Sequence, residues 1–227
     1  MNKQISTLSA AILAMSISTF ASADVLVDWD LTDLVGNEAA RAANSFAAGL
    51  TGNDLLRGAG LTGSTGANAL NASGWTGEAT DYFSFGFSVG AGYQVDLGSL
   101  VIATRSSGTG PGAMGLFYSG NGFSSALYTF NQAPGGNYVN TIVDLGALQD
   151  LTGQVEFRIA QIGTASANGG TTGSAGTFRV AEYADGINYT NLQLNGVVAA
   201  PVPEADVYAM MLAGLGLLGF AARRRKG

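Results

Sequence analysis

The chain has neither cysteine nor histidine among its 227 residues. Their absence excludes disulfides, zinc sites of the Cys/His type, thiol nucleophiles and every catalytic pair that relies on a histidine base. Charged residues are also scarce, at 11%, where about 25% is usual. Glycine is abundant instead, with 34 residues. This balance disfavours a helix-rich enzyme, and we expect no catalytic residues, no metal and no cofactor.

The amino-terminal segment has the pattern of a secretory signal peptide. Lys3 precedes an apolar run over about 8–20, and Ala21 and Ala23 flank Ser22 in a small-x-small cleavage site. The sequence therefore predicts a signal helix over residues 1–23 and a mature chain that begins at Asp24. The alternative is an uncleaved anchor.

The carboxyl-terminal segment has the pattern of a minimal membrane helix. An uncharged run over 207–222 is followed by Arg223, Arg224 and Arg225. Sixteen helical residues reach roughly 24 Å, which spans a thin bilayer when flanking arginines snorkel. Basic residues beside a membrane helix stay on the cytoplasmic side, so the rest of the chain is expected on the far side. The alternative is a buried core helix with a basic tail.

The same segment resembles a known sorting signal. Val202, Pro203 and Glu204 precede a glycine- and leucine-rich run and the arginine cluster, as in the PEP-CTERM sorting signal of Gram-negative bacteria; Ala205 replaces the second proline of the motif. The resemblance covers residues 201–227. It implies transport across the inner membrane, retention by the tail, processing by the membrane peptidase exosortase, and release to the cell surface or the extracellular polysaccharide matrix.

The body between these signals, residues 24–200, is acidic and has no lysine. It carries fourteen Asp and Glu residues against five Arg, a net charge of −9. Nucleic acids and anionic lipid surfaces are bound by clustered Lys and Arg. The body is therefore expected to bind neither.

Apolar residues of the body repeat with period two, which predicts half-buried strands. The predicted strands are Val25 to Leu31, Leu55 to Leu61, Phe83 to Val89, Tyr93 to Thr104, Met114 to Tyr118, Leu127 to Phe130, Tyr138 to Leu145, Val155 to Ile159, Phe178 to Tyr183 and Tyr189 to Val198. Asn121-Gly122 is a hairpin signal. Residues 58–77 and 164–176 are of low complexity and are expected to be loops, whereas 35–50 could form a short helix or coil. This pattern predicts an all-β protein, an antiparallel β-sandwich of jelly-roll or lectin-like type.

Two groups of residues are candidates for binding. Asp28, Asp30 and Asp33 could hold Ca²⁺ through their oxygen atoms, or could form a solvated acidic edge. Among the aromatic residues beside loops, Trp75 and Phe123 are the candidates for stacking on a sugar ring. We therefore expect an exported, non-enzymatic surface or matrix protein that binds carbohydrate. The alternatives are a secreted polysaccharide hydrolase that uses paired carboxylates, and a purely structural matrix protein.

Overall fold

The computed structural model of the protein describes residues 24–200 and residues 213–214. The body, 24–200, consists of strands and loops, with two short 3-10 turns at Ser119–Asn121 and Pro134–Gly136. The expected signal peptide with Ala21 and Ala23 lies outside the described residues, as does the expected membrane helix apart from 213–214. No helix in the described ranges is long and apolar enough to cross a membrane.

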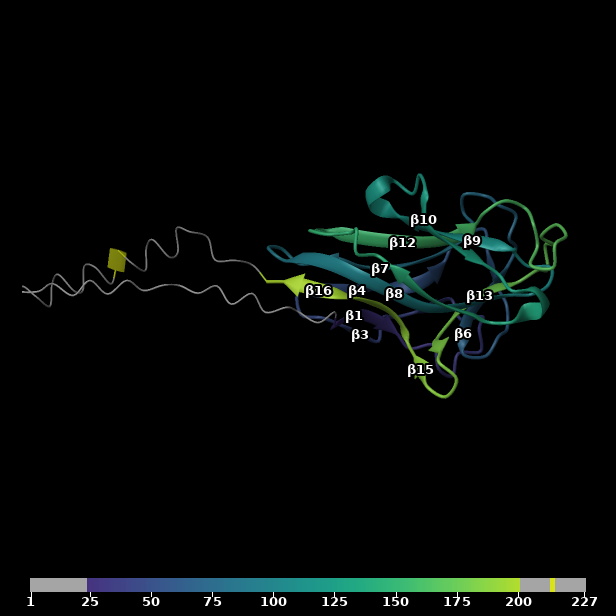
Figure 1. The fold of residues 1–227 in the computed structure, drawn as a ribbon, viewed down its shortest axis with the longest axis horizontal. Helices are drawn as coiled ribbons and strands as arrows, with labels where there is room; N and C mark the ends of the chain where they lie inside the picture. The colour runs from purple at the N-terminus through teal and green to yellow at the C-terminus, as the bar shows by residue number, and fades with distance from the viewer. Residues whose placement is uncertain (1–23, 201–212, 215–227) are drawn as a thin grey trace, which may run out of the picture.

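Two antiparallel sheets form the body, with a small hairpin beside them (Figure 1). The eight-stranded sheet contains β1 (Asp24–Trp29), β3 (Ser45–Phe46), β5 (Thr62–Gly63), β6 (Ala69–Ser73), β8 (Gln94–Ser106), β11 (Val139–Asp144), β13 (Phe178–Ala181) and β16 (Leu192–Ala199). The six-stranded sheet, in the order β10-β9-β12-β7-β4-β2, contains β2 (Ala40–Arg41), β4 (Leu50–Arg57), β7 (Tyr82–Val89), β9 (Ala113–Tyr118), β10 (Ala126–Asn131) and β12 (Gln154–Gln161). The hairpin is β14 (Tyr183–Ala184) with β15 (Tyr189–Thr190).

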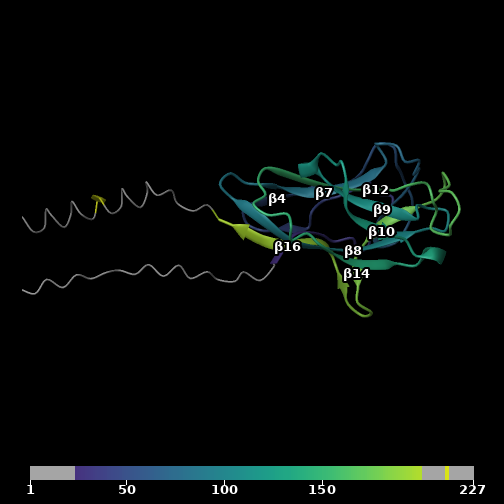
Figure 2. The same ribbon diagram turned by 45° about the horizontal axis from the view of Figure 1, so that its top comes forward.

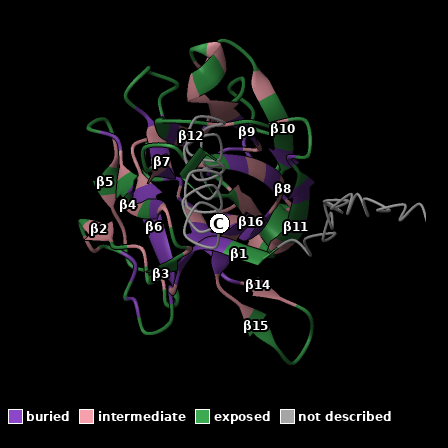
Figure 3. Ribbon diagram, turned by 90° about the vertical axis from the view of Figure 1, so that its left-hand side faces the viewer, coloured by how far each residue is buried: buried purple, intermediate pink, exposed green. Residues whose placement is uncertain are grey.

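The two sheets pack face to face, as Figure 2 shows with β4, β7 and β12 in one layer and β8 and β16 in the other. Aromatic rings join the layers: the centroids of Trp29 on β1 and Phe85 on β7 are 5.4 Å apart, and those of Phe83 on β7 and Phe178 on β13 are 6.1 Å apart. Buried residues gather between the sheets (Figure 3). One continuous apolar core thus lies within 24–200, so this body has what a domain requires to fold by itself.

The long central strand β8 organises the eight-stranded sheet. It pairs with β16 along residues 94–101, with β13 along 103–106 and with β11 along 99–104. β1 pairs in turn with β16, which places the first and last residues of the body at the same end of the sandwich (Figure 1).

The predicted alternation and the predicted antiparallel sandwich are confirmed. Phe83, Phe85 and Phe87 point into the core from β7, and Val155, Phe157 and Ile159 do so from β12. Each predicted strand overlaps an observed one, although the last two are each broken in two, around the β14–β15 hairpin.

One loop prediction needs correction, and the choice between helix and coil that the sequence left open for 35–50 can be made. Residues 58–77 are not one loop, because β5 and β6 lie within them and Ala69, Leu70, Asn71 and Ala72 are buried. The small side chains that suggested low complexity are those that fit a strand covered on both faces. Residues 35–50 form no α-helix; they contain the two-residue strands β2 and β3 joined by irregular backbone.

Candidate functional site

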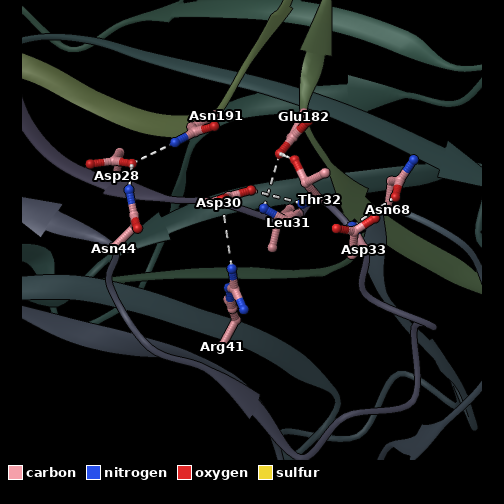
Figure 4. Close-up of polar contacts among 10 residues, drawn as sticks. All are labelled: Asp28, Asp30, Leu31, Thr32, Asp33, Arg41, Asn44, Asn68, Glu182 and Asn191. Carbon is pink, nitrogen blue, oxygen red and sulfur yellow. Dashed lines mark hydrogen bonds and ion pairs between the residues drawn. The ribbon is translucent and has the colours of Figure 1, made fainter.

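The three aspartates near the start of the body do not converge on one point (Figure 4). Asp28 on β1 is only 5% exposed. Its carboxylate accepts hydrogen bonds from Nδ2 of Asn44 at 3.0 Å, from Nδ2 of Asn191 at 2.5 Å and from the hydroxyl of Ser45. The prediction of a solvated acidic edge is therefore wrong for Asp28, because Asn44 and Ser45 cover it.

Asp30 and Asp33 have partners of their own. Hydrogen bonding from the backbone amide of Thr32, at 2.9 Å, lowers the pKa of Asp30, and Arg41 lies 3.8 Å from the same carboxylate. Asp33 has left-handed backbone, with φ of 64°, and its amide donates to Oδ1 of Asn68. Within 24–200 and 213–214, no group of three or more acidic residues could hold a metal ion.

Trp75 lies in the core, not on the surface. It is 2% exposed, and its Nε1 donates to the carbonyl of Ala72 at 3.0 Å. Its ring packs against those of Phe83 and Phe178, with centroids 5.7 Å and 5.6 Å away. The prediction that Trp75 stacks on a sugar is wrong, because Phe83 of β7 and Phe178 of β13 pack against the ring and the carbonyl of Ala72 on β6 accepts from its polar edge.

Phe123 is half-buried in the loop between β9 and β10, beside Arg158 of β12. Its φ is 57°, an uncommon conformation for a bulky residue that costs on the order of 1–3 kcal/mol. The loop is held by the amide of Phe123 donating to the carbonyl of Tyr118 at 3.0 Å, and by the amide of Glu156 donating to the hydroxyl of Ser119 at 3.0 Å. These bonds fix the Phe123 ring above the outer face of β12.

The guanidinium carbon of Arg158 lies 4.0 Å from the centroid of the Phe123 ring and 4.3 Å from that of the Tyr82 ring. Its Nε donates to Oε1 of Glu156 at 2.7 Å. No bond from its two Nη groups is formed within the described body, so their protons are free to donate. Arg158 is thus held in place by two rings and a carboxylate while it keeps unused donors.

Two hollows on the six-stranded sheet share Tyr82 and Arg158 as lining residues, and we call the pair the Arg158 cleft. The first, about 280 Å³, is also bordered by Glu78, Phe117, Phe123 and Gln161. The second, about 310 Å³, is also bordered by Asn53, Asp54, Ser84, Gln154 and Glu156. The cleft runs across the outer faces of β4, β7 and β12, which are neighbours in the six-stranded sheet.

One wall of the cleft is a rigid loop, residues 76–81. The buried carboxylate of Asp81 accepts from the amide and hydroxyl of Thr76, at 2.8 and 2.7 Å, and from the amide of Glu78 at 3.1 Å. Gln161 also borders the cleft, and its Oε1 is a buried acceptor with no hydrogen-bond partner in the described structure. The cleft therefore combines aromatic rings with fixed donors and acceptors.

Of the residues that border the cleft, Phe123 alone was a sequence candidate. Tyr82, Arg158 and Gln161 were missed as binding residues. Arg158 and Glu156 were recognisable as outward positions of β12, because they alternate with the buried Val155, Phe157 and Ile159. The proximity of residues 82, 123 and 158 depends on strand pairing, which alternation does not reveal.

The carboxyl-terminal residues Val202, Pro203, Glu204, Arg223, Arg224 and Arg225 lie outside the described residues, so their identification depends on the sequence. A family model of the PEP-CTERM protein-sorting motif matches residues 201–226. The chain carries a PEP-CTERM sorting signal. This is the C-terminal signal of exosortase substrates, and it implies an exported protein that passes through the membrane to the cell surface.

Comparison with solved structures found two weakly similar chains. One is a mutant of CBM29-2, a family 29 carbohydrate binding module, complexed with mannohexaose: 15% identity, 78% of this chain, 92% of that chain and a TM-score of 0.36. The other is a carbohydrate binding module of family 29, with 15% identity, 78% and 89% coverage and a TM-score of 0.38. The search of curated proteins gave no match.

Proposed function

We propose that this exported protein is a non-catalytic, lectin-like β-sandwich that binds extracellular polysaccharide in the Arg158 cleft. The observation that carries the proposal is the stack of Arg158 with Tyr82 and Phe123, which opens onto a groove lined by amides and carboxylates. Exosortase would process the precursor near Pro203 and Glu204 while the tail holds it in the inner membrane. The body would then reach the cell surface or the polysaccharide matrix.

The chemistry of the cleft suits a pyranose ring. Such a ring has an apolar C–H face that packs on aromatic side chains, and hydroxyls on its rim that each donate and accept. The cleft offers the rings of Tyr82, Phe117 and Phe123 for the face. The Nη groups of Arg158 lie beside Glu156, whose Oε2 makes no hydrogen bond within residues 24–200. Arg158 can therefore donate to one sugar hydroxyl while Oε2 of Glu156 accepts from the neighbouring one.

The charge of the body indicates which polysaccharides are favoured. A net charge of −9 repels polyanions. Neutral chains avoid this repulsion and keep Arg158 in its pair with Glu156. We therefore expect neutral hexose polymers to bind more tightly than uronic-acid polymers of the same length.

Hydrolysis makes a different demand on the cleft. Glycoside hydrolysis requires one carboxylic acid with a raised pKa beside a second carboxylate. Sugar release from a bound polysaccharide, abolished by substitution of one cleft carboxylate, would overturn the non-catalytic assignment.

The test is a glycan array with the purified body, residues 24–200, and two variants. Phe123→Ala removes a ring from the cleft, and Phe46→Ala, a matched control, removes a ring that is 50% exposed on β3 of the other sheet. Loss of the stacking contact at Phe123, worth about 1.4 kcal/mol, weakens binding roughly tenfold. Phe46→Ala leaves affinity unchanged. Absence of binding to every glycan, or equal effects of both substitutions, would overturn the proposal.

A further inference from the structure

A second cavity lies on the other face of the sandwich, between the β14–β15 hairpin and the eight-stranded sheet. Its volume is about 340 Å³, and it is bordered by Tyr138, Tyr189, Asn68, Asn140 and Glu182 together with three alanines. We call it the hairpin cavity. The hairpin and the strands β9 and β12 lie on opposite sides of the body in Figures 1 and 3, so the hairpin cavity and the Arg158 cleft face away from each other.

Glu182 supplies an acceptor inside the hairpin cavity. The residue is only 8% exposed, and its Oε1 accepts from the amide of Leu31 and the hydroxyl of Thr32, each at 3.0 Å (Figure 4). No hydrogen bond to Oε2 is formed by any residue from 24 to 200. Oε2 is not among the fully buried atoms of the described residues, and Glu182 borders the cavity. Oε2 can therefore accept a hydrogen bond from a ligand hydroxyl in the cavity.

Asn68 supplies a donor to the same cavity. Its Oδ1 accepts from the amide of Asp33 at 3.0 Å, which fixes the orientation of the side-chain amide. The backbone amide of Asn68 donates to the carbonyl of Leu34 at 2.9 Å, and the φ of Asn68 is 52°. The backbone at Asn68 is therefore held as well. Nδ2 of Asn68 has no acceptor in the described body. The cavity therefore offers one free donor and one free acceptor, as neighbouring hydroxyls require.

Two tyrosines supply the apolar surface. Tyr138 is 44% exposed and Tyr189 is 73% exposed. The guanidinium of Arg105 lies 5.2 Å from the centroid of the Tyr138 ring and orients it. The hairpin that carries Tyr189 is tied to β11 by Asn140, whose side-chain amide donates to the carbonyl of Ala184 and accepts from its amide. The rings are thus positioned on anchored backbone.

We infer that the hairpin cavity is a second pyranose-binding site, and that the body is bivalent. The ligand class rests on the proposed function, because the same combination of rings, donor and acceptor is invoked at both sites. With sites on opposite faces, one molecule joins two polysaccharide chains. The protein then cross-links polysaccharide chains in the matrix, whereas a protein with one site would bind a single chain.

Isothermal titration of the body with neutral hexasaccharides of glucose, mannose and galactose tests the inference. We expect two sites per molecule in the wild type. Tyr189→Ala and Glu182→Gln should each weaken the hairpin-cavity site, and Phe123→Ala should weaken the Arg158-cleft site roughly tenfold, so that each variant shows one site with wild-type affinity. Ile187→Ala, the matched control, removes an 89% exposed side chain at the tip of the same hairpin and leaves two sites. Tyr189→Ala changes an exposed residue, so it keeps the test valid even when Glu182→Gln fails to fold.

A second measurement reads bivalency directly. The wild-type body should precipitate the polysaccharide that corresponds to the bound hexasaccharide, and each single-site variant should bind without precipitating it. The wild type could instead show a single site. If Phe123→Ala weakens that site while Tyr189→Ala and Glu182→Gln leave it unchanged, the inference is overturned and the proposed function stands. If Tyr189→Ala and Glu182→Gln weaken it while Phe123→Ala leaves it unchanged, the hairpin cavity is supported and binding in the Arg158 cleft is overturned. Binding of none of the three hexasaccharides would overturn both.

Discussion

Replacement of Trp75 tests whether this residue stabilises the fold or contacts a ligand. Trp75→Ala removes a side chain that is 2% exposed, together with its contacts to Phe83 and Phe178. Substitution of a buried aromatic residue by alanine costs about 3–5 kcal/mol. The bond from Nε1 to the carbonyl of Ala72 is lost as well, worth about 1 kcal/mol within that range. We therefore expect a loss of about 3–5 kcal/mol, a large part of the 5–15 kcal/mol of an ordinary domain.

The same loss can be expressed as a melting temperature. The entropy of unfolding is about 2.1 cal/mol/K per residue, which for the 177 residues of the body gives a decrease of roughly 8–13 °C. Trp75→Phe keeps the ring contacts and loses the hydrogen bond and some volume, so its cost is about 1–2 kcal/mol. Phe46→Ala, at a half-exposed position, should cost less than about 1 kcal/mol.

The assay is urea unfolding and thermal melting of the body, with glycan affinity measured for each variant that remains folded. Trp75→Phe should keep wild-type affinity, because the ring does not reach the surface. A loss of stability below about 1 kcal/mol for Trp75→Ala, or a loss of affinity in folded Trp75→Phe, would refute the assignment of Trp75 to the core.

Two further substitutions test polar contacts of the body. Burial acts to raise the pKa of Glu38, but hydrogen bonds from the amides of Val35 and Gly36, at 2.7 and 2.9 Å, outweigh it and lower the pKa. Glu38 therefore adds stability above its ordinary pKa of 4.5 and loses it as pH falls through the lowered value. Urea unfolding from pH 7 to pH 3 should show wild type more stable than Glu38→Gln at pH 7, with the difference shrinking below 4.5; a difference constant with pH would contradict this. Asp28→Ala leaves the amides of Asn44 and Asn191 without their acceptor and should cost about 2–4 kcal/mol, with Asp28→Asn costing less. Calcium should leave the melting temperature of the wild type unchanged, and a rise on its addition would show that an ion binds.

The fold followed from the sequence to a large degree because strand alternation is a local property. Phe83, Phe85 and Phe87 alternate with small polar residues, so one face of their strand had to be buried wherever its neighbours lay. The Asn121-Gly122 signal also marked a true hairpin between β9 and β10, although its turn spans more residues than a two-residue loop. The prediction that Trp75 lies on the surface failed because the residues beside it in the sequence are small or polar. Its environment is built by β7 and β13, which are distant in sequence.

The candidate site could be anticipated only in part. Phe123 was recognised as an aromatic residue beside a turn, but its value depends on Arg158 and Tyr82, which lie on different strands. Their proximity depends on the register of β12 against β7, which pairs Arg158 with Ser84 and Ala160 with Tyr82. A shift of that register by one residue would turn Arg158 into the core. Nothing in the sequence distinguishes Glu182 from the other thirteen acidic residues of the body, because its burial beside Leu31 and Thr32 depends on the tertiary structure.

The sequence alone determined the acidic and lysine-free character of the body. It also predicted the signal peptide, the sorting signal and the all-β sandwich. These are properties of composition and of short-range pattern, and the match of residues 201–226 to the PEP-CTERM motif is of the same kind. Only the tertiary structure decided that Trp75 and Asp28 are buried, and that Arg158 and Glu182 face separate cavities on opposite sides of the body. Alternation specifies which face of a strand is covered, whereas strand order, register and the loops laid over each sheet decide which distant side chains meet there.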